Sequence, residues 1–320
     1  MTHVLRVRNV ETAMGEGFQW LKVAGVPAAS RNGPVLVAPG PVITEYERPR
    51  ERVVFNPARD ANPVFHLLES IWMLAGAENV GFLLPYNARM AEYAEPNGAM
   101  HGAYGHRWRY RFGANQIIEV IELLTKNTDS RRAVMQMWSA KADLGATKRD
   151  LPCNTHIYLS LKEGTLDMTV CCRSNDALWG AYGANAVHFS MLQELIAAGV
   201  GVEVGVYRQF SNNFHVYTEN ETVKRWLDLP PHYEGGYPHR VVPMIGHGET
   251  VRDFLYDCEC MVYGPANAWR TAFFHRVVAP LKHVYDARKR GAKTWRGMLD
   301  GVAECDWKDS FIEWANRRDK

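Results

Sequence analysis

The sequence predicts an α+β fold, organised as a single domain over residues 1–320 with a helical extension from about residue 250. Three observations lead to this prediction. Apolar residues recur at helical spacing in two segments of the first half, a strand–turn–strand pattern follows, and a mostly apolar helix comes next. No internal repeat, low-complexity tract or change of composition marks a domain boundary.

The first predicted helix begins at Asn62-Pro63, because Asn accepts hydrogen bonds at an N-cap and Pro fits the first turn. Gly76 ends it, and its apolar face contains Leu67, Leu68, Ile71, Trp72 and Leu74. The same spacing predicts a second helix over 114–126, capped by Asn127. An apolar strand is predicted from Ala133 to Trp138.

Alternating residues predict a β-hairpin with one buried face. Its strands cover 155–161 and 166–170, and Lys162-Glu163-Gly164 forms the turn. A buried helix is predicted over 186–198 and ends at Gly199. Residues 229–248 are rich in Pro, Gly and His, which predicts a surface connection, and 265–289 and 307–318 are predicted to be helical.

Composition indicates an ordinary globular enzyme, with 47% hydrophobic and 22% charged residues and a net charge of +2. No nucleic-acid surface is expected from this charge, and no membrane span or secretion signal from the apolar pattern. The six cysteines fit no disulfide framework and predict a reduced, cytoplasmic protein. Cys258 and Cys260 favour burial over metal binding, so no metal is expected.

Cys153 is the candidate nucleophile, since it follows Leu151-Pro152 at the mouth of a predicted strand. Arg131, Arg132 and Arg173 lie close to it in the sequence, and guanidinium groups near a thiol favour the reactive thiolate. Together with Ser174 these arginines suggest a phosphate clamp, because Arg matches phosphate in a bidentate manner.

Six segments follow one another along the chain in this order: FHLLESIWMLAG, NGAMHGAYGHRWR, RRAVMQMW, LPCNTHIYLSL, CCRSNDALWGAYGAN and NNFHVYTEN. Over about residues 60–220 the chain therefore resembles the thymidylate synthase family, which includes pyrimidine-nucleotide hydroxymethylases. The resemblance implies a large mixed β-sheet packed with helices, and a homodimer formed through the sheet. It also implies a pyrimidine nucleoside monophosphate as substrate and 5,10-methylenetetrahydrofolate as co-substrate.

The resemblance further implies a role for individual residues. The catalytic residues would be Cys153 as nucleophile, Glu69 for water and proton transfers, and Tyr104. The nucleotide would be bound through its phosphate, base and sugar by Arg31, Arg173, Ser174, Asn185, His215 and Tyr217. Arg131 and Arg132 would reach the phosphate of the neighbouring subunit. The folate would contact Asp176, Met90 and Tyr93.

Departures from the synthase pattern favour a hydroxymethylated product. Met90-Ala-Glu-Tyr93 replaces Trp-Asp-Glu-Trp, and the synthase C-terminal segment that excludes water is missing. GAYGAN is one residue longer than its counterpart, and Asn154 replaces a histidine, so the base contacts stay open.

An amide at Asn185 favours uracil, because it pairs with N3–H and O4 together, although Asn185 could instead cap the helix at Ala186. The expected reaction converts dUMP to 5-hydroxymethyl-dUMP in a phage-type enzyme. The alternatives are a thymidylate synthase, a dCMP or CMP hydroxymethylase, and a non-catalytic nucleotide- or RNA-binding protein. His156 and His188 are interpreted as packing residues.

Overall fold

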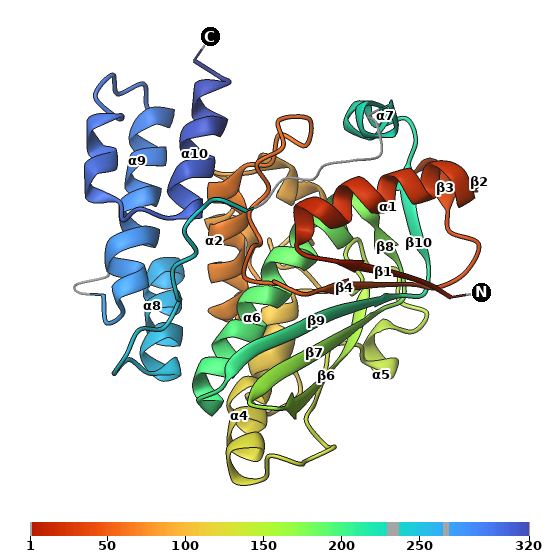
Figure 1. The fold of residues 1–320 in the computed structure, drawn as a ribbon, viewed down its shortest axis with the longest axis horizontal. Coiled ribbons are helices and arrows are strands. Elements are labelled where there is room, and N and C mark those ends of the chain that lie inside the picture. The colour runs from red at the N-terminus through yellow and green to blue at the C-terminus, as the bar shows by residue number, and fades with distance from the viewer. Residues whose placement is uncertain (1, 229–236, 265–268, 320) are drawn as a thin grey trace.

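The computed structural model of the chain describes residues 2–228, 237–264 and 269–319. A six-stranded sheet, a layer of helices on one of its faces and a second helical group beyond that layer succeed one another across the molecule (Figure 1). The predicted α+β class with a large mixed sheet is confirmed.

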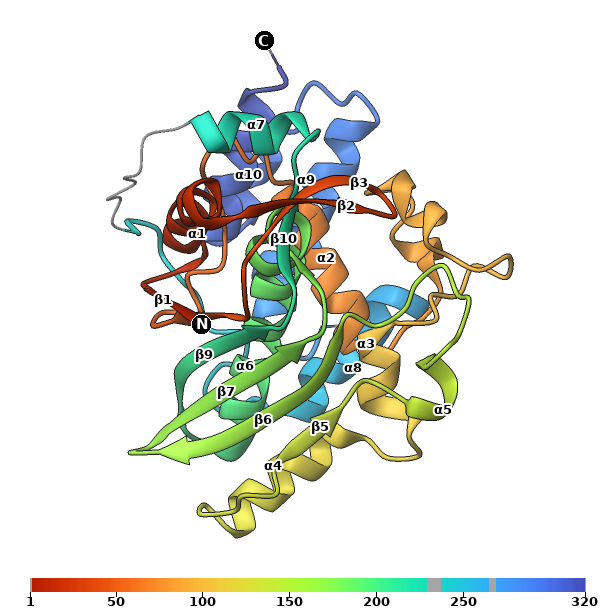
Figure 2. The same ribbon diagram turned by 90° about the vertical axis from the view of Figure 1, so that its right-hand side faces the viewer.

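The strands of the large sheet lie in the order β1 (His3–Val7), β4 (Val42–Tyr46), β9 (Glu203–Ser211), β7 (Thr165–Cys172), β6 (Asn154–Lys162) and β5 (Val134–Gln136). The β1–β4 and β7–β9 pairs are parallel, and the others are antiparallel. Helix α6 (Asn185–Val200) packs on β7 and β9. Figure 2 shows the opposite face of these strands toward the viewer, with the helices behind them.

The predicted hairpin is β6 and β7. Lys162 pairs with Thr165, and the two residues between them have positive φ, 47° at Glu163 and 79° at Gly164. Two such residues in succession match the twist of a tight hairpin. Ile157 and Leu159 are buried on the helical side, while Tyr158 is exposed on the other face.

Helix α2 (Pro63–Leu74) begins as predicted, because the Asn62 side chain accepts a hydrogen bond from the Phe65 backbone N–H. Helix α4 (Gln116–Lys126) has the expected C-cap at Asn127. The predicted end of α6 at Gly199 is wrong. The helix continues to Val200, and Gly201, with φ of 82°, ends it.

A second sheet was not foreseen from the sequence. It has the strand order β2 (Val26–Ser30), β3 (Gly33–Val37), β10 (Phe214–Tyr217) and β8 (Asn175–Asp176). Helix α1 (Val10–Ala24) connects β1 to β2. This sheet places the N-terminal β2–β3 hairpin beside residues far away in the sequence.

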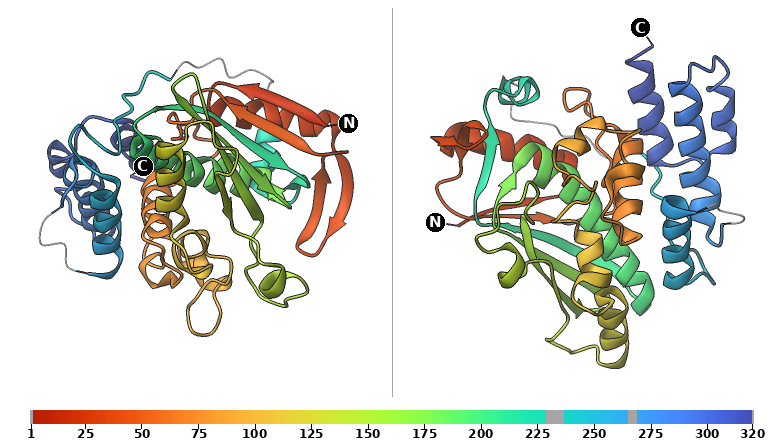
Figure 3. Two further views of the ribbon diagram at one scale, coloured as in Figure 1. Left: turned by 90° about the horizontal axis from the view of Figure 1, so that it is seen from below. Right: turned by 180° about the vertical axis from the view of Figure 1, so that it is seen from behind.

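The C-terminal helices α8 (Val251–Tyr263) and α10 (Asp306–Asn316) pack on α2, with η5 (Phe274–Val278) and α9 (Ala279–Lys289) beside them (Figure 3). Helix α8 lies within the predicted helical extension, although the sequence analysis gave it no bounds of its own. Residues 229–236 and 265–268 of the predicted connection and helix lie outside the described residues, and 237–248 form no helix or strand.

The shorter helices are α3 (Tyr104–His106), α5 (Ala140–Asp143), α7 (Glu221–Asp228), η1 (Val80–Phe82), η2 (Ala88–Glu92), η3 (Arg107–Arg111), η4 (Ala177–Ala184) and η6 (Gly297–Gly301). Across residues 2–228, 237–264 and 269–319, no helix has the length and apolar character needed to cross a membrane. All six cysteines carry free thiols. The described residues contain no cluster of three or more potential metal ligands.

Candidate active site

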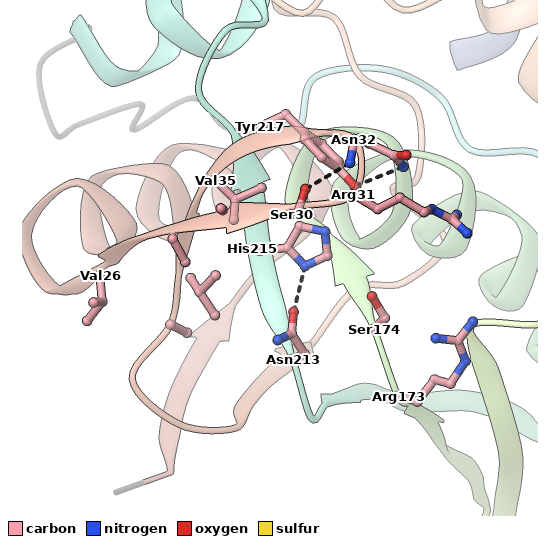
Figure 4. A pocket seen from close by; sticks show the side chains of 14 residues that line it. Val26, Ser30, Arg31, Asn32, Val35, Arg173, Ser174, Asn213, His215 and Tyr217 are labelled. Atoms are coloured by element: carbon pink, nitrogen blue, oxygen red, sulfur yellow. Dashed lines mark hydrogen bonds between the residues drawn. The ribbon is translucent and has the colours of Figure 1, made fainter.

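Two adjoining pockets contain most of the predicted site residues. The Cys153 pocket, of about 730 Å³, is lined among others by Glu69, Met90, Tyr93, Tyr104, Cys153, Ser174, Asp176 and Asn185. The His215 pocket is lined by Arg31, Arg173, Ser174, His215, Tyr217 and neighbouring residues of β2 and β3 (Figure 4). Ser174 lines both. Arg131 and Arg132 line neither pocket and are exposed just before β5.

Cys153 is held in place through its backbone. The Tyr104 hydroxyl accepts hydrogen bonds from the N–H groups of Cys153 (2.9 Å) and Asn154 (3.0 Å). The close approach of α3 to α2 requires Gly105, since a Cβ there would lie 1.8 Å from the Met73 carbonyl oxygen. Tyr104 and the nucleophile are therefore fixed relative to each other by packing between helices.

The Arg173 side chain contacts the segment that carries Cys153. Its Nε donates to the Pro152 carbonyl at 2.9 Å, and one Nη lies 3.9 Å from the Cys153 sulfur. Its guanidinium also lies over the ring of Trp138, 5.5 Å from the centroid. The side chain is exposed at its outer end, so it can contact both the thiol and a ligand in the His215 pocket.

Arg173 acts on the pKa of the Cys153 thiol in the expected direction, but other groups oppose it. Burial raises the pKa of the Cys153 thiol, Arg173 lowers it, and the carboxylates of Asp150 and Asp176 raise it further. Burial and like charge together outweigh one guanidinium. The net effect is a raised pKa, which favours the neutral thiol over the thiolate.

The Asn185 side chain faces the Cys153 pocket and does not cap α6. Its Oδ1 accepts from the Asn154 amide and its Nδ2 donates to Asn175 Oδ1, both at 3.0 Å. An amide has two donor hydrogens and two acceptor positions, so one of each remains available. The amide is held and can still bind a ring.

Glu69 lies beside a residue that the sequence interpretation assigned to packing. Its Oε2 is 3.1 Å from His188 Nε2, and the two side chains are 12% and 5% exposed. The angle between the two groups does not allow a hydrogen bond. His188 Nε2 is therefore close to the carboxylate but forms no hydrogen bond with a described residue. His66, one turn before Glu69, also lines the pocket, and burial lowers its pKa well below the usual value.

His188 itself does not line the Cys153 pocket and reaches it only through Glu69, so its interpretation as a packing residue stays a prediction. His66 lines the pocket and was missed by sequence reasoning. The available indication was spacing: His66 precedes Glu69 by three residues, which places both on one face of a helix. That indication alone does not separate a site residue from a packing one.

Asp176 lies at the end of β8 and caps η4, with Oδ1 accepting from the Trp179 N–H at 2.6 Å. Its Oδ2 is buried and has no partner within the described residues. Burial raises the pKa of Asp176. Trp179 is 47% exposed, and the buried Arg59 guanidinium lies 4.8 Å from its ring centroid.

The His215 pocket is more open. His215 Nδ1 is 2.8 Å from Asn213 Oδ1, and the imidazole meets Tyr217 edge-on (Figure 4). Arg31, in the turn between β2 and β3, is exposed and extends to the same side of β10 as Arg173. The second sheet therefore unites cations separated by more than a hundred residues.

The C-terminal helix α10 gives the Cys153 pocket a wall that the sequence interpretation did not expect. Trp314 and Arg318 line the pocket, and the Arg318 guanidinium lies 4.0 Å from the Trp314 ring centroid. Arg318 also donates to Asp60 at 2.9 Å and 2.5 Å. Residues of the C-terminal helical group thus form part of the pocket wall.

Comparison with known proteins supports the resemblance. The sequence profile of the family described as thymidylate synthase matches residues 60–233. The deoxyuridylate hydroxymethyltransferase of Pseudomonas phage M6 is 42% identical over 336 residues, covering 98% of this chain and 94% of that protein. The protein of that name from Bacillus phage SP01 is 34% identical, covering 67% of this chain and 58% of its own length. A putative thymidylate synthase of Methanothermobacter thermautotrophicus is 37% identical over 38% of this chain.

Proposed function

Because this chain belongs to the thymidylate synthase family, we propose that it converts dUMP to 5-hydroxymethyl-dUMP. The observation that carries the proposal is the joining of two pockets at Ser174, one with the thiol and the other with exposed cations. The ring would lie in the Cys153 pocket against Asn185. The phosphate would bind Arg31, Arg173 and Ser174, and the sugar hydroxyl His215 and Tyr217.

The residues of the Cys153 pocket also fit a reduced folate. Asp176 Oδ2 is buried and has no hydrogen-bond partner among the described residues, a state that costs about 1–3 kcal/mol and that an N–H of a pterin ring would relieve. Methylenetetrahydrofolate would supply the one-carbon unit. Asp176, Met90 and Tyr93 would hold it, and the pocket adds aromatic walls at Trp179 and Trp314.

The residues divide the chemistry among them. The Cys153 thiolate adds to C6, the electrons move toward O4, and C5 becomes nucleophilic. The Asn185 N–H would stabilise charge on O4, because it is positioned before reaction. Arg173 opposes the effect of burial on the thiol and so helps to form the thiolate.

Once the one-carbon unit is an exocyclic methylene at C5, water completes the reaction. The water oxygen bonds to the methylene carbon, the double bond moves to C5–C6, and the C6–sulfur bond breaks. Glu69 accepts the water proton, which then returns to the departing thiolate. Arg318 and Trp314 limit access to the pocket from the side of α10.

The test is a product assay in which the protein is incubated with methylenetetrahydrofolate and dUMP or dCMP. Mass spectrometry identifies the nucleotide, and absorbance follows dihydrofolate. A hydroxymethyl product from dUMP without dihydrofolate is expected. A methyl product with dihydrofolate would instead indicate a synthase, and a product from dCMP alone would contradict the proposed base. We expect this activity in the cytoplasm, and we expect its substrates to be small metabolites and not nucleic acid.

The proposed assembly is a homodimer through the open face of the large sheet. This face exposes Val4, Val134 and Tyr158, with Val134 and Tyr158 directly paired across β5 and β6. Arg131 and Arg132, exposed beside this edge, would reach the phosphate in the partner's site.

Complementation tests this sharing. In a mixed dimer of Cys153→Ala and Arg131→Ala/Arg132→Ala subunits, one site has neither group and the other has both. Random mixing of the two inactive proteins is expected to restore about a quarter of the wild-type activity. If the arginines act within their own chain, mixing restores none.

A further inference from the structure

A row of side-chain amides runs from Asn154, at the start of β6, through the protein interior to η4. We infer that this row fixes the direction in which Asn185 faces the pyrimidine, and that Asn154, Asn175 and Gln209 are positioning residues for the choice between uracil and cytosine. The inference rests on the proposed function, because it concerns the base of that substrate.

The row is continuous. Asn154 Nδ2 donates to Asn185 Oδ1 at 3.0 Å, and Asn185 Nδ2 donates to Asn175 Oδ1 at 3.0 Å. Asn175 Nδ2 donates to Gln209 Oε1 at 3.0 Å, and Gln209 Nε2 donates to the Ala181 carbonyl at 3.0 Å. All four side chains are buried. Asn154 and Gln209 do not line the pocket and so act only through their neighbours, whereas Asn175 lines the pocket beside Asn185.

The last acceptor sets the direction of the whole row. A backbone carbonyl can only accept, so the atom of Gln209 that faces Ala181 must be the NH2 group. Its Oε1 then faces Asn175, and the same requirement passes to Asn185 and Asn154 in turn. The Tyr46 hydroxyl donates to the same carbonyl at 3.0 Å and holds it in place.

The Ala181 carbonyl is available because η4 is interrupted. Tyr182 and Gly183 leave helical geometry, with φ/ψ of −105°/16° and −124°/−112°. Ala181 lies in GAYGAN, the segment that the family resemblance implies to be one residue longer than in the synthases. Extra residues inside helices commonly produce such wide turns at functional sites. The GAYGAN segment thus supplies the Ala181 carbonyl, which is the acceptor at the end of the row.

A reversed Asn185 would place oxygen against oxygen at Asn175 and N–H against N–H at Asn154. Reversal of the complete row would turn the Gln209 oxygen toward the Ala181 carbonyl. Uracil offers N3–H and O4, whereas cytosine offers an acceptor and a donor in the same two places. An amide held in one direction therefore suits one base, and a freely rotating amide would suit both.

Two substitutions cut the row, and both are tested by nucleotide binding without folate. Gln209→Met removes the link to Ala181 at similar volume, and Asn175→Ala removes the link between Asn185 and Gln209. Calorimetry with dUMP and with dCMP gives the ratio of their dissociation constants. Each variant is expected to reduce the preference for dUMP by roughly tenfold or more, since a site with a fixed polar arrangement rejects the mismatched base strongly.

One control variant separates the orientation of Asn185 from a general loss of stability. Gln193→Met removes another buried amide of α6, which donates to the Leu166 carbonyl at 2.8 Å, and should leave the ratio unchanged. A purely structural role would lower the affinity for both nucleotides equally.

An unchanged ratio in either folded row variant overturns the inference, while dUMP binding and turnover by the wild-type protein leave the proposed function intact. If the wild-type protein binds neither nucleotide, the proposed function itself fails.

Discussion

The Cys153 and His215 pockets differ in how completely one chain builds them. In the Cys153 pocket, Tyr104 anchors the nucleophile, amides hold Asn185, and Glu69 faces His188 across helices α2 and α6. In the His215 pocket, Arg31 and Arg173 extend into solvent from a turn and a strand end.

This difference follows from what each end has to bind. Bond formation at C6 depends on small displacements, so its groups are held by buried contacts before the ligand arrives. A phosphate carries its own charge and can order exposed arginines when it binds. The comparison therefore predicts large losses of turnover at the Cys153 pocket and moderate losses of affinity at the His215 pocket.

The largest expected effect is that of Cys153→Ala. Turnover should fall at least roughly a thousandfold, because no other thiol of the described residues lines the pocket. Gel electrophoresis under denaturing conditions with 5-fluoro-dUMP and methylenetetrahydrofolate should show an adduct for the wild-type protein and none for the variant. If the variant still binds dUMP with the affinity of the wild-type protein, the thiol acts in turnover and not in binding, as the comparison of the two pockets predicts. A loss of dUMP affinity would contradict that comparison.

Glu69→Gln should lower turnover about 10²- to 10⁴-fold, since it removes the proposed proton acceptor. Affinity for dUMP should stay within a few-fold, as measured by calorimetry. The His239–Asp309 pair, 3.0 Å apart and outside both pockets, provides a matched control, and His239→Gln should leave turnover unchanged. A Glu69→Gln protein with normal turnover would remove the carboxylate from the mechanism.

Arg173→Ala tests a residue of the His215 pocket whose guanidinium also lies 3.9 Å from the Cys153 sulfur. Affinity for dUMP should fall roughly 10- to 100-fold, because a charge-assisted contact with phosphate is lost. The pKa of Cys153 should also rise further, since Arg173 lowers it, so alkylation of the thiol by iodoacetamide should require higher pH. Arg173→Lys keeps the charge and should shift the alkylation profile less. An unshifted profile in Arg173→Ala would confine Arg173 to phosphate binding.

Arg318→Ala should have the smallest effect, a few-fold increase in the KM for methylenetetrahydrofolate with the KM for dUMP unchanged. Its pair with Asp60 is half-exposed and contributes at most about 1 kcal/mol to stability. Burial raises the pKa of Asp60, but ion pairs with Arg318 and Arg317 outweigh it and lower the pKa overall. The stabilisation is therefore present above about pH 4 and lost as pH falls, which thermal melts can follow. An altered KM for dUMP would contradict the assignment of Arg318 to the folate side of the Cys153 pocket.

Local patterns predicted the elements that depend on neighbouring residues. The Asn62 cap of α2 and the tight turn at Glu163-Gly164 are set by side chains and φ angles within a few residues. The end of α6 was misplaced because Gly199 has a packing role: a Cβ there would lie 2.6 Å from Ile121 Cδ1 and 2.9 Å from Val251 Cγ2. A glycine required by distant contacts cannot be distinguished by sequence from one that ends a helix.

The sequence by itself determined the family, the candidate nucleophile and most residues around it, because these are recorded in motifs of fixed order. Only the tertiary structure decided which groups act on one another. The raised pKa of the Cys153 thiol, the His188–Glu69 approach and the pocket wall at Trp314 depend on burial and on contacts between distant segments. Electrostatic and packing energies depend on distance in space, which the order of residues does not specify.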